Sequence, residues 1–319
     1  MKKFLLHSTV IAALVITAAS CSKDKATTPD PTAGQIKADD FKAKYAVKEQ
    51  SFTGNAATGF VVTGEKGIKI TFPANAFKDS ITGDVVTGTV TVKLTEILSK
   101  KDIVLSGPMT ESYGQLLVSG GEFKVKATAA DGRVLVPGDS AIQVAVPQVM
   151  KAGDMNLFVQ APRKVDGNNV PPPDYANTWI PAPYAPFGMG DNAYIFTLPS
   201  FTWVNCDRFY SDPNPKTTIT VSPDFQDTDS VSSIQVMIVF KDITTVITLP
   251  FNFQLGQFQS YLNSLPVGLE GELVITGKDA DGFIEFGTQH ITIAENMHID
   301  APIARSTEAT VAAFLNTIQ

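Results

Sequence analysis

The sequence is poor in cysteine and histidine. It has two cysteines and three histidines among 319 residues. One pair of cysteines cannot build the dense disulfide framework of a small exported domain. Beyond the N-terminal segment only His290 and His298 remain, eight residues apart, with no cysteine or acidic residue at the spacing that zinc sites use. Disulfide-stapled and zinc-dependent classes are therefore excluded.

Charge is also scarce, and its balance is acidic. Charged residues make up 18% of the chain. Residues 1–20 contain two lysines and no acidic residue, so the rest has 23 basic and 32 acidic side chains and a formal charge of about −9. Binding to phosphate backbones needs the opposite sign. Nucleic acid is therefore not an expected partner.

Motifs of catalysis are missing as well. The sequence has no glycine-rich phosphate loop, no Gly-x-Ser-x-Gly elbow and no pair of acids at a readable spacing. We therefore predict a protein without enzymatic activity and without a resident cofactor. An enzyme whose acidic residues meet only in the fold stays open as an alternative.

The N-terminus has the three parts of a secretory signal. Two lysines precede a mostly apolar run over residues 4–19, and small residues follow. The sequence Ala-Ala-Ser-Cys at 18–21 resembles the bacterial lipobox, although Ala18 stands where leucine is commonest. The resemblance implies that Cys21 is lipidated and begins the mature chain. A plain signal peptide is the alternative, because Ala18 and Ser20 also fit a small-x-small cleavage site.

A polar segment follows Cys21. Residues 22–35 are rich in Lys, Asp, Thr and Pro and have almost no apolar side chains, so they cannot bury surface. We predict a flexible tether over residues 21–49. Several acyl chains hold a protein durably on a membrane. The expected location is therefore the bacterial outer membrane, facing the periplasm or the cell surface.

Short alternating segments, typical of β-strands, begin near residue 50. Over residues 89–98, Val90, Val92 and Leu94 fall on one side and threonine and lysine on the other. Similar segments cover 68–72, 122–127, 142–146, 194–198 and 202–205, and turns are expected at 82–84, 120–121 and 131–132. These patterns predict a first β-sandwich domain over residues 50–210.

A second β-sandwich is predicted over residues 217–319, after a proline-containing boundary at 211–215. Its expected strands cover 234–240, 246–249, 272–276, 283–286 and 290–293, with a hairpin turn at 281–282. The predicted fold class is thus all-β, with two sandwich domains.

Two helices are expected in the second domain. At the C-terminus, Ser306 or Thr307 can cap a helix that packs on a sheet through apolar residues at helical spacing, namely Val311, Phe314, Leu315 and Ile318. A shorter helix is expected over residues 258–262.

Four segments of the first domain together form a recognisable pattern. They are Gly-Ile-Lys-Ile-Thr-Phe-Pro-Ala-Asn-Ala-Phe at 67–77, Gly83, Gly-Thr-Val-Thr-Val-Lys-Leu-Thr-Glu at 88–96, and Ser-Gly-Gly-Glu-Phe at 119–123. They resemble the ZU5-like β domain of exported Bacteroidetes proteins. Residues 203–209 are similar to a segment often seen after that domain, and the C-terminal part, an Ig/transthyretin-like sandwich, resembles the way such proteins end.

The ZU5 resemblance covers most of residues 50–319. It implies a β-sandwich-like first domain, an extracytoplasmic location and a role in protein interaction or module docking, and it carries no catalytic residue. Some ZU5-containing proteins cleave themselves at a His-Phe-Ser site. That triplet does not occur here, because His290 and His298 are each followed by isoleucine.

Cys206 is the one other cysteine. As a nucleophile it would need a base beside it, and the two histidines are far away in sequence. We expect a buried thiol packed near Trp203 and Phe209, with Asp207 and Arg208 pairing locally.

Calcium could bind carboxylates that cluster in loops. Asp224, Asp227 and Asp229 form one such cluster, and Asp279 and Asp281 beside a glycine form another. Neither follows the complete twelve-residue calcium loop. Solvated loops and turns are the expected alternative.

A proline-rich segment over residues 165–190 offers the most plausible recognition surface. Trp179, Tyr184 and Phe187 could present flat faces to sugar rings or to a protein partner. Alternatively, these rings fold back and cap the first sandwich. The leading hypothesis is a lipid-anchored binding or assembly module that contacts an envelope protein, and a carbohydrate-binding accessory protein is the second.

Overall fold

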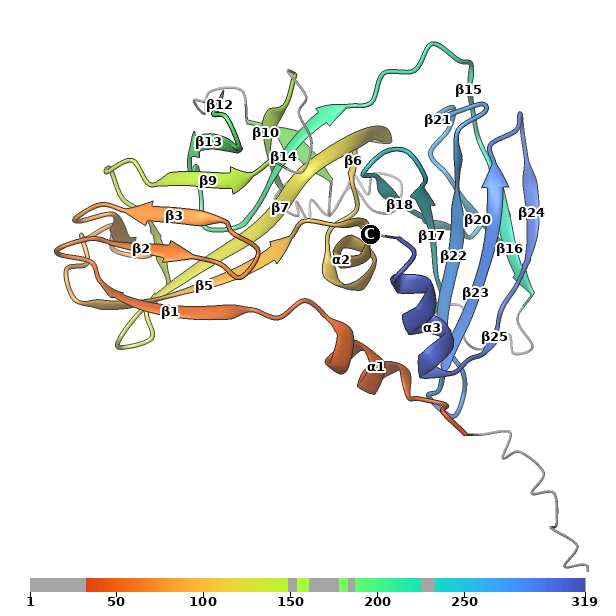
Figure 1. Cartoon of the computed structure of the whole chain (residues 1–319), viewed down its shortest axis with the longest axis horizontal. Coiled ribbons are helices and arrows are strands. Elements are labelled where there is room, and N and C mark those ends of the chain that lie inside the picture. The colour runs from red at the N-terminus through yellow and green to blue at the C-terminus, as the bar shows by residue number, and fades with distance from the viewer. Residues whose placement is uncertain (1–32, 149–153, 161–177, 183–186, 225–232, 319) are drawn as a thin grey trace, which may run out of the picture. The chain divides into compact units, whose positions relative to one another are not determined.

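The computed structural model describes residues 33–148, 154–160, 178–182, 187–224 and 233–318 (Figure 1). The chain from Gly34 onward forms one compact unit. Most of it is β-structure in several antiparallel sheets, which confirms the all-β class. The division into two domains near residues 211–216 stays a prediction of the sequence.

Two sheets enclose the first apolar core. One has the strand order β1 (Gln50–Asn55), β5 (Thr89–Ile97), β7 (Gln115–Ala129), β14 (Trp203–Phe209), β10 (Asn156–Gln160), β11 (Trp179–Pro181), with β6 (Glu111–Ser112) on β7. The other has the order β12 (Phe187–Met189), β13 (Ala193–Thr197), β9 (Gln143–Pro147), β3 (Lys69–Phe72), β2 (Phe60–Thr63). A small pair joins β4 (Phe77–Asp79) to β8 (Leu135–Pro137). Alternation explains the packing, since Val90, Val92 and Leu94 of β5 are fully buried.

Two further sheets enclose a second core. The larger has the order β18 (Val246–Leu249), β17 (Gln235–Phe240), β22 (Glu270–Lys278), β23 (Ile284–Thr292), β25 (Ala304–Arg305). The smaller has the order β19 (Phe251–Asn252), β20 (Gln257–Gln259), β16 (Thr220–Asp224), β24 (His298–Pro302), and its β16–β24 pair is parallel. A short ladder joins β15 (Lys216–Thr217) to β21 (Leu265–Pro266).

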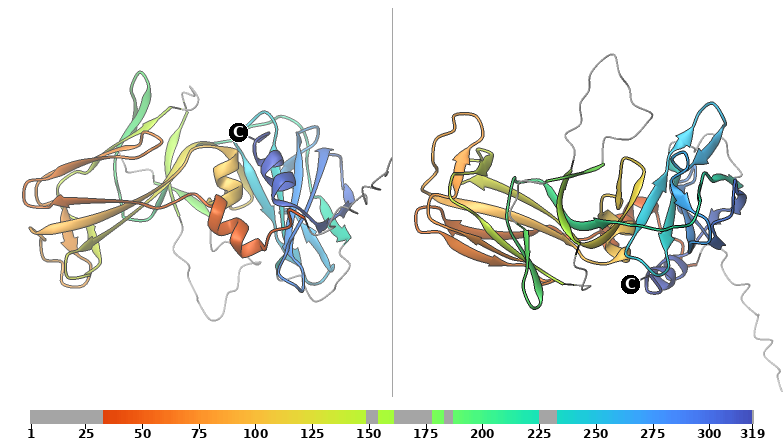
Figure 2. Two further views of the ribbon diagram at one scale, coloured as in Figure 1. Left: turned by 60° about the horizontal axis from the view of Figure 1, so that its bottom comes forward. Right: turned by 90° about the horizontal axis from the view of Figure 1, so that it is seen from above.

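Three helices cover the face of the larger of these sheets that points away from the second core. They are α1 (Ala38–Tyr45), α2 (Lys100–Ser106) and α3 (Glu308–Leu315), and Figure 2 shows them gathered beside that sheet. Phe41 of α1 and Val311 of α3 join Met237 and Val239 of β17 in a third apolar cluster. Burial on both faces explains why β17 is an almost continuous apolar run. No helix among the described residues is long and apolar enough to cross a membrane.

The predicted C-terminal helix is confirmed. The Thr307 side chain accepts a hydrogen bond from the backbone N–H of Thr310, which is the expected cap. Val311, Leu315 and Ile318 are buried, and the Phe314 ring lies 5.5 Å from that of Phe286 on β23, measured between centroids. The helix therefore packs on a sheet.

Hydrogen bonds connect the first pair of sheets to the second. The Thr245 hydroxyl donates to the Leu117 carbonyl at 2.6 Å, and the backbone N–H of Thr110 donates to the Val246 carbonyl at 2.9 Å. Lys100 Nζ donates to the Phe240 carbonyl at 3.0 Å.

The expectation of a flexible tether over residues 21–49 is wrong for its last part. Residues 38–45 form α1, because Phe41 and Tyr45, one helical turn apart, stack at 4.4 Å between ring centroids and Phe41 is buried. Glu308 on α3 accepts a hydrogen bond from the Tyr45 hydroxyl at 2.7 Å. Residues 21–32 lie outside the described part of the chain.

Three local predictions are also corrected. Residues 120–121 are not a turn between strands but a bulge inside β7, where the register against β14 shifts. Residues 257–259 form β20 rather than the start of a helix, because Phe258 must point into the second core. The strands predicted at 283–286 and 290–293 are one continuous strand, β23.

Candidate binding groove

Two of the three rings of the predicted aromatic surface, those of Trp179 and Phe187, pack against the fold. Trp179 is fully buried in β11, and its indole N–H donates to the Met109 carbonyl at 2.9 Å, so the ring cannot meet a ligand. Phe187 is half-buried, with its ring 5.7 Å from that of Tyr194 between centroids. Tyr184 lies outside the described residues. For Trp179 and Phe187, folding back onto the sandwich outweighs exposure because it removes large apolar rings from water.

The predicted calcium ligands are only partly described. Asp224 is exposed at the end of β16, whereas Asp227 and Asp229 lie outside the described residues. In the other cluster, Asp279 and Asp281 both pair with Arg305, which occupies their carboxylates. Within the part of the chain that the structure describes, no group of three or more His, Cys, Asp or Glu side chains is placed to hold a metal ion.

Cys206 is buried, as expected, but its neighbours differ from the prediction. It lies in the core between the first two sheets, whereas Trp203 packs with a separate cluster that contains Trp179. Asp207 turns inward, and Arg208 lies near Asp154 instead, at 3.7 Å. Burial, reinforced by Asp207, raises the pKa of the Cys206 thiol well above its usual range, which suppresses the nucleophilic thiolate.

A buried acidic pair beside Cys206 was missed in the sequence. Glu122 on β7 and Asp207 on β14 are both fully buried, and the Asn205 amide bridges them. Its Nδ2 donates to Asp207 Oδ2 at 2.6 Å and to Glu122 Oε1 at 3.3 Å. The second oxygen of each carboxyl, Glu122 Oε2 and Asp207 Oδ1, has no hydrogen-bond partner in the described structure.

Burial determines the protonation of this pair. It raises the pKa of Glu122 well above its usual range, and the nearby Asp207 charge raises it further. The pKa of Asp207 is also raised well above its usual range by burial, against the lowering effect of the neighbouring polar groups of Ser119, the Gly120 backbone and Asn205. Neither carboxyl has exposed surface among the described residues, so in this state neither offers itself to a substrate.

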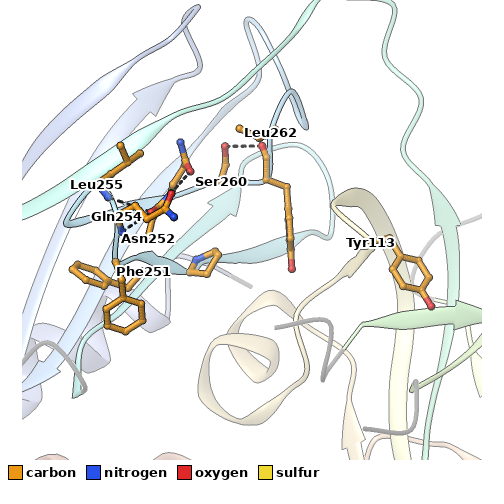
Figure 3. Close-up of a pocket in the computed structure, with 11 residues that line it drawn as sticks. Tyr113, Phe251, Asn252, Gln254, Leu255, Ser260 and Leu262 are labelled. Atoms are coloured by element: carbon orange, nitrogen blue, oxygen red, sulfur yellow. Dashed lines mark hydrogen bonds between the residues drawn. The ribbon is translucent and has the colours of Figure 1, made fainter. Parts of the chain in front are cut away.

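An open groove with different chemistry lies at the hairpin of β19 and β20. A hollow of about 810 Å³ is lined by Tyr113, Pro250, Phe251, Asn252, Phe253, Gln254, Leu255, Gln259, Ser260, Tyr261 and Leu262. Figure 3 shows Phe251, Asn252 and Leu255 on one side of it and Tyr113 on the other. We call these eleven residues the hairpin groove.

The local sequence fixes the hairpin side of the groove. Asn252 Oδ1 accepts hydrogen bonds from the backbone N–H groups of Gln254 at 3.0 Å and Leu255 at 3.2 Å, which closes the turn. Its Nδ2 donates to Gln259 Oε1 at 2.8 Å across the hairpin. The turn thereby holds Phe253 in solvent, where 83% of the residue is exposed.

The β6–β7 turn supplies the opposite side. Tyr113 stands in this turn with a φ of 50°, a left-handed conformation that is uncommon for an aromatic residue. Its backbone N–H donates to the Thr178 hydroxyl at 2.8 Å. At Gly114 an added Cβ would lie 2.9 Å from the Cβ of Tyr261, so only glycine lets the turn approach Tyr261 so closely.

A second hollow of about 440 Å³ shares Tyr113, Tyr261 and Leu262 with the hairpin groove. Its lining includes Asp212 and Lys216, but Asp212 accepts hydrogen bonds from the Tyr210 hydroxyl and the Asn214 backbone. The Asp212 carboxylate is therefore engaged within the fold.

No family model and no curated protein matches this chain.

Proposed function

We propose that this chain is a lipid-anchored protein of the bacterial outer membrane that acts as a non-enzymatic binding module, built on a ZU5-like first domain and an Ig/transthyretin-like second one. The observation that carries the proposal is a contrast in exposure. Aromatic and amide side chains line an open groove, whereas the buried cysteine and the buried acidic pair beside it, Cys206, Glu122 and Asp207, have no exposed surface. Such a lining favours binding over catalysis.

Anchoring follows from the N-terminus. The lipobox-like sequence ends at Cys21, and the polar residues 22–33 separate it from the compact unit that begins at Gly34. Almost none of these residues is apolar, so the segment has the composition expected of a link between acyl chains in a membrane and a folded unit.

The experiment compares the two cysteines. With radioactive palmitate in a Gram-negative host, the wild-type chain should be labelled and should enter the detergent phase on phase separation. Cys21→Ser should lose both properties. Cys206→Ala is the matched control and should keep both, because its thiol is buried 185 positions away in sequence. Unlabelled wild-type protein, or a mature N-terminus that does not begin at Cys21, would overturn the anchor.

A further inference from the structure

The hairpin groove is neutral over its whole lining. None of its eleven residues is an Asp, Glu, Lys, Arg or His. A site for an anionic ligand commonly presents arginine or lysine, and a site for a metal cation presents carboxylates. The groove offers neither, which favours an uncharged ligand.

Exposed apolar surface is concentrated here. Leu262 is 76% exposed and Tyr113 56% exposed, and with Phe253 they border a single hollow. Water-exposed apolar side chains gathered at a concave surface mark a binding site more strongly than the same side chains scattered singly. The rings of Phe251 and Phe253 stand edge to face with centroids 5.1 Å apart, so they offer surfaces in two orientations.

Amide groups lie between the rings. Gln254 is exposed at the tip of the hairpin, and Gln259 lies on β20 with its Oε1 held by Asn252. An amide offers both donors and acceptors without charge. Rings with flat faces, combined with neutral donors and acceptors, match a ligand that has both apolar faces and hydroxyl edges.

Backbone strain is concentrated at the same place. Among the described residues, four other than glycine have a positive φ, and two of them, Tyr113 and Asn263, border the two adjoining hollows. Tyr113 is the one of the four that is not asparagine, and asparagine tolerates this region far better. The fold therefore holds a large ring at the groove in a conformation that opposes stability, which points to a role in binding.

We propose that the hairpin groove binds a neutral glycan, with the rings of Phe253, Tyr261 and Tyr113 stacking on sugar faces and the amides of Gln254 and Gln259 bonding to hydroxyl groups. This inference rests on the proposed function and names the ligand of the binding module. A membrane surface fits less well, because the groove is concave and carries no basic side chain that would attract anionic lipids.

The test uses the mature lipidated protein in detergent micelles, probed on an array of neutral and acidic glycans, with dissociation constants for the bound glycans measured by calorimetry. Neutral glycans should bind, and Phe253→Ala should weaken binding by roughly tenfold, the loss expected for one ring contact. Ile81→Ala is the matched control, since Ile81 is 92% exposed and lies outside the groove. It should bind like the wild type.

Tyr113→Gly separates binding from folding. Glycine accepts the left-handed conformation without strain, so this variant should unfold at an equal or higher urea concentration while its glycan affinity falls by roughly tenfold. Loss of affinity together with loss of stability would instead show a structural ring and overturn the role assigned to Tyr113.

Three outcomes would overturn the glycan proposal. They are the absence of binding to any neutral glycan, binding that Phe253→Ala leaves unchanged, and a groove-dependent flotation with phosphatidylglycerol vesicles by the Cys21→Ser protein without glycan binding. None of them affects the palmitate label at Cys21, so a wrong ligand is distinguished from a wrong anchor.

Discussion

The two pairs of sheets share an architecture but differ in whether their buried polar side chains can ionise. All the buried acidic side chains of the described residues belong to the N-terminal region, namely Asp79, Glu96, Asp102, Glu122 and Asp207. From residue 217 onward the buried polar side chains are hydroxyls, namely Thr217, Thr245 and Ser260. The first region thus has ionisable groups in its interior, and the second has a neutral interior with its polar chemistry at the surface groove.

Within the first region the buried acids fall into two kinds. Glu96 accepts hydrogen bonds from the backbone N–H groups of Lys66 at 2.9 Å and Ile68 at 2.9 Å, so it fastens the β2–β3 turn. Asp102 completes the capping box of α2 and pairs with Lys66 at 2.6 Å. These carboxylates are satisfied, whereas Glu122 and Asp207 each keep an oxygen without a partner. Stability should therefore depend on pH chiefly through the second kind.

The largest effect on stability is expected at Trp179, the buried indole of the proline-rich segment. Trp179→Ala should lower the free energy of unfolding by about 3–5 kcal/mol, because it empties a cluster with Leu117 and Phe158. Trp203→Ala is the comparison, since this ring is only partly buried. Urea unfolding followed by circular dichroism measures both. Equal losses would show that burial of the indole does not set the difference.

The acidic pair provides the next effect, and it tests the contrast between the regions directly. Burial raises the folded pKa of Glu122 and Asp207. Their contribution to stability is therefore full below the unfolded pKa, near 4, and is lost as the pH rises through the folded pKa. Glu122→Gln or Asp207→Asn removes that loss, so each variant should gain about 1–3 kcal/mol on the wild type between pH 4 and pH 8.

The measurement is the free energy of unfolding in urea at each pH, plotted as variant minus wild type. Glu272→Gln is the control in the second region, where Glu272 contacts the exposed His290 at 2.8 Å. Its difference should stay nearly flat, because exposed pairs contribute little. A flat difference for Asp207→Asn and Glu122→Gln as well would remove the distinction between the two regions.

The sequence predicts those parts of this structure that depend on local periodicity. The alternation in residues 89–98 predicts β5 with its correct buried face, and Thr307 with the apolar residues after it predicts α3. The acidic pair could not be found this way, because residues 116–123 of β7 are buried on both faces, whereas simple alternation assigns the face of Glu122, opposite to Phe123, to solvent. A glycine pair within an apolar run, followed by an acid, was the available signal.

The groove could not be predicted from the sequence for a different reason. Tyr113 and Phe253 are 140 positions apart in sequence, and only the approach of the β6–β7 turn to Tyr261 brings them to one hollow. Composition instead pointed to the proline-rich segment, where aromatic residues are dense. Trp179 shows that density of aromatics in sequence does not separate an exposed ring from a buried one.

The smallest effect on stability is expected in the helices that cover the second region. Thr307→Ala removes the cap of α3 and should lower the free energy of unfolding by about 1 kcal/mol at every pH from 5 to 8. Ser306→Ala is the matched control one position earlier, where no side-chain hydrogen bond holds the residue, and should have almost no effect. Urea unfolding measures both variants. A Thr307→Ala loss that grows with pH would mean that the second region also depends on an ionisable interior, because a neutral cap has no proton to release.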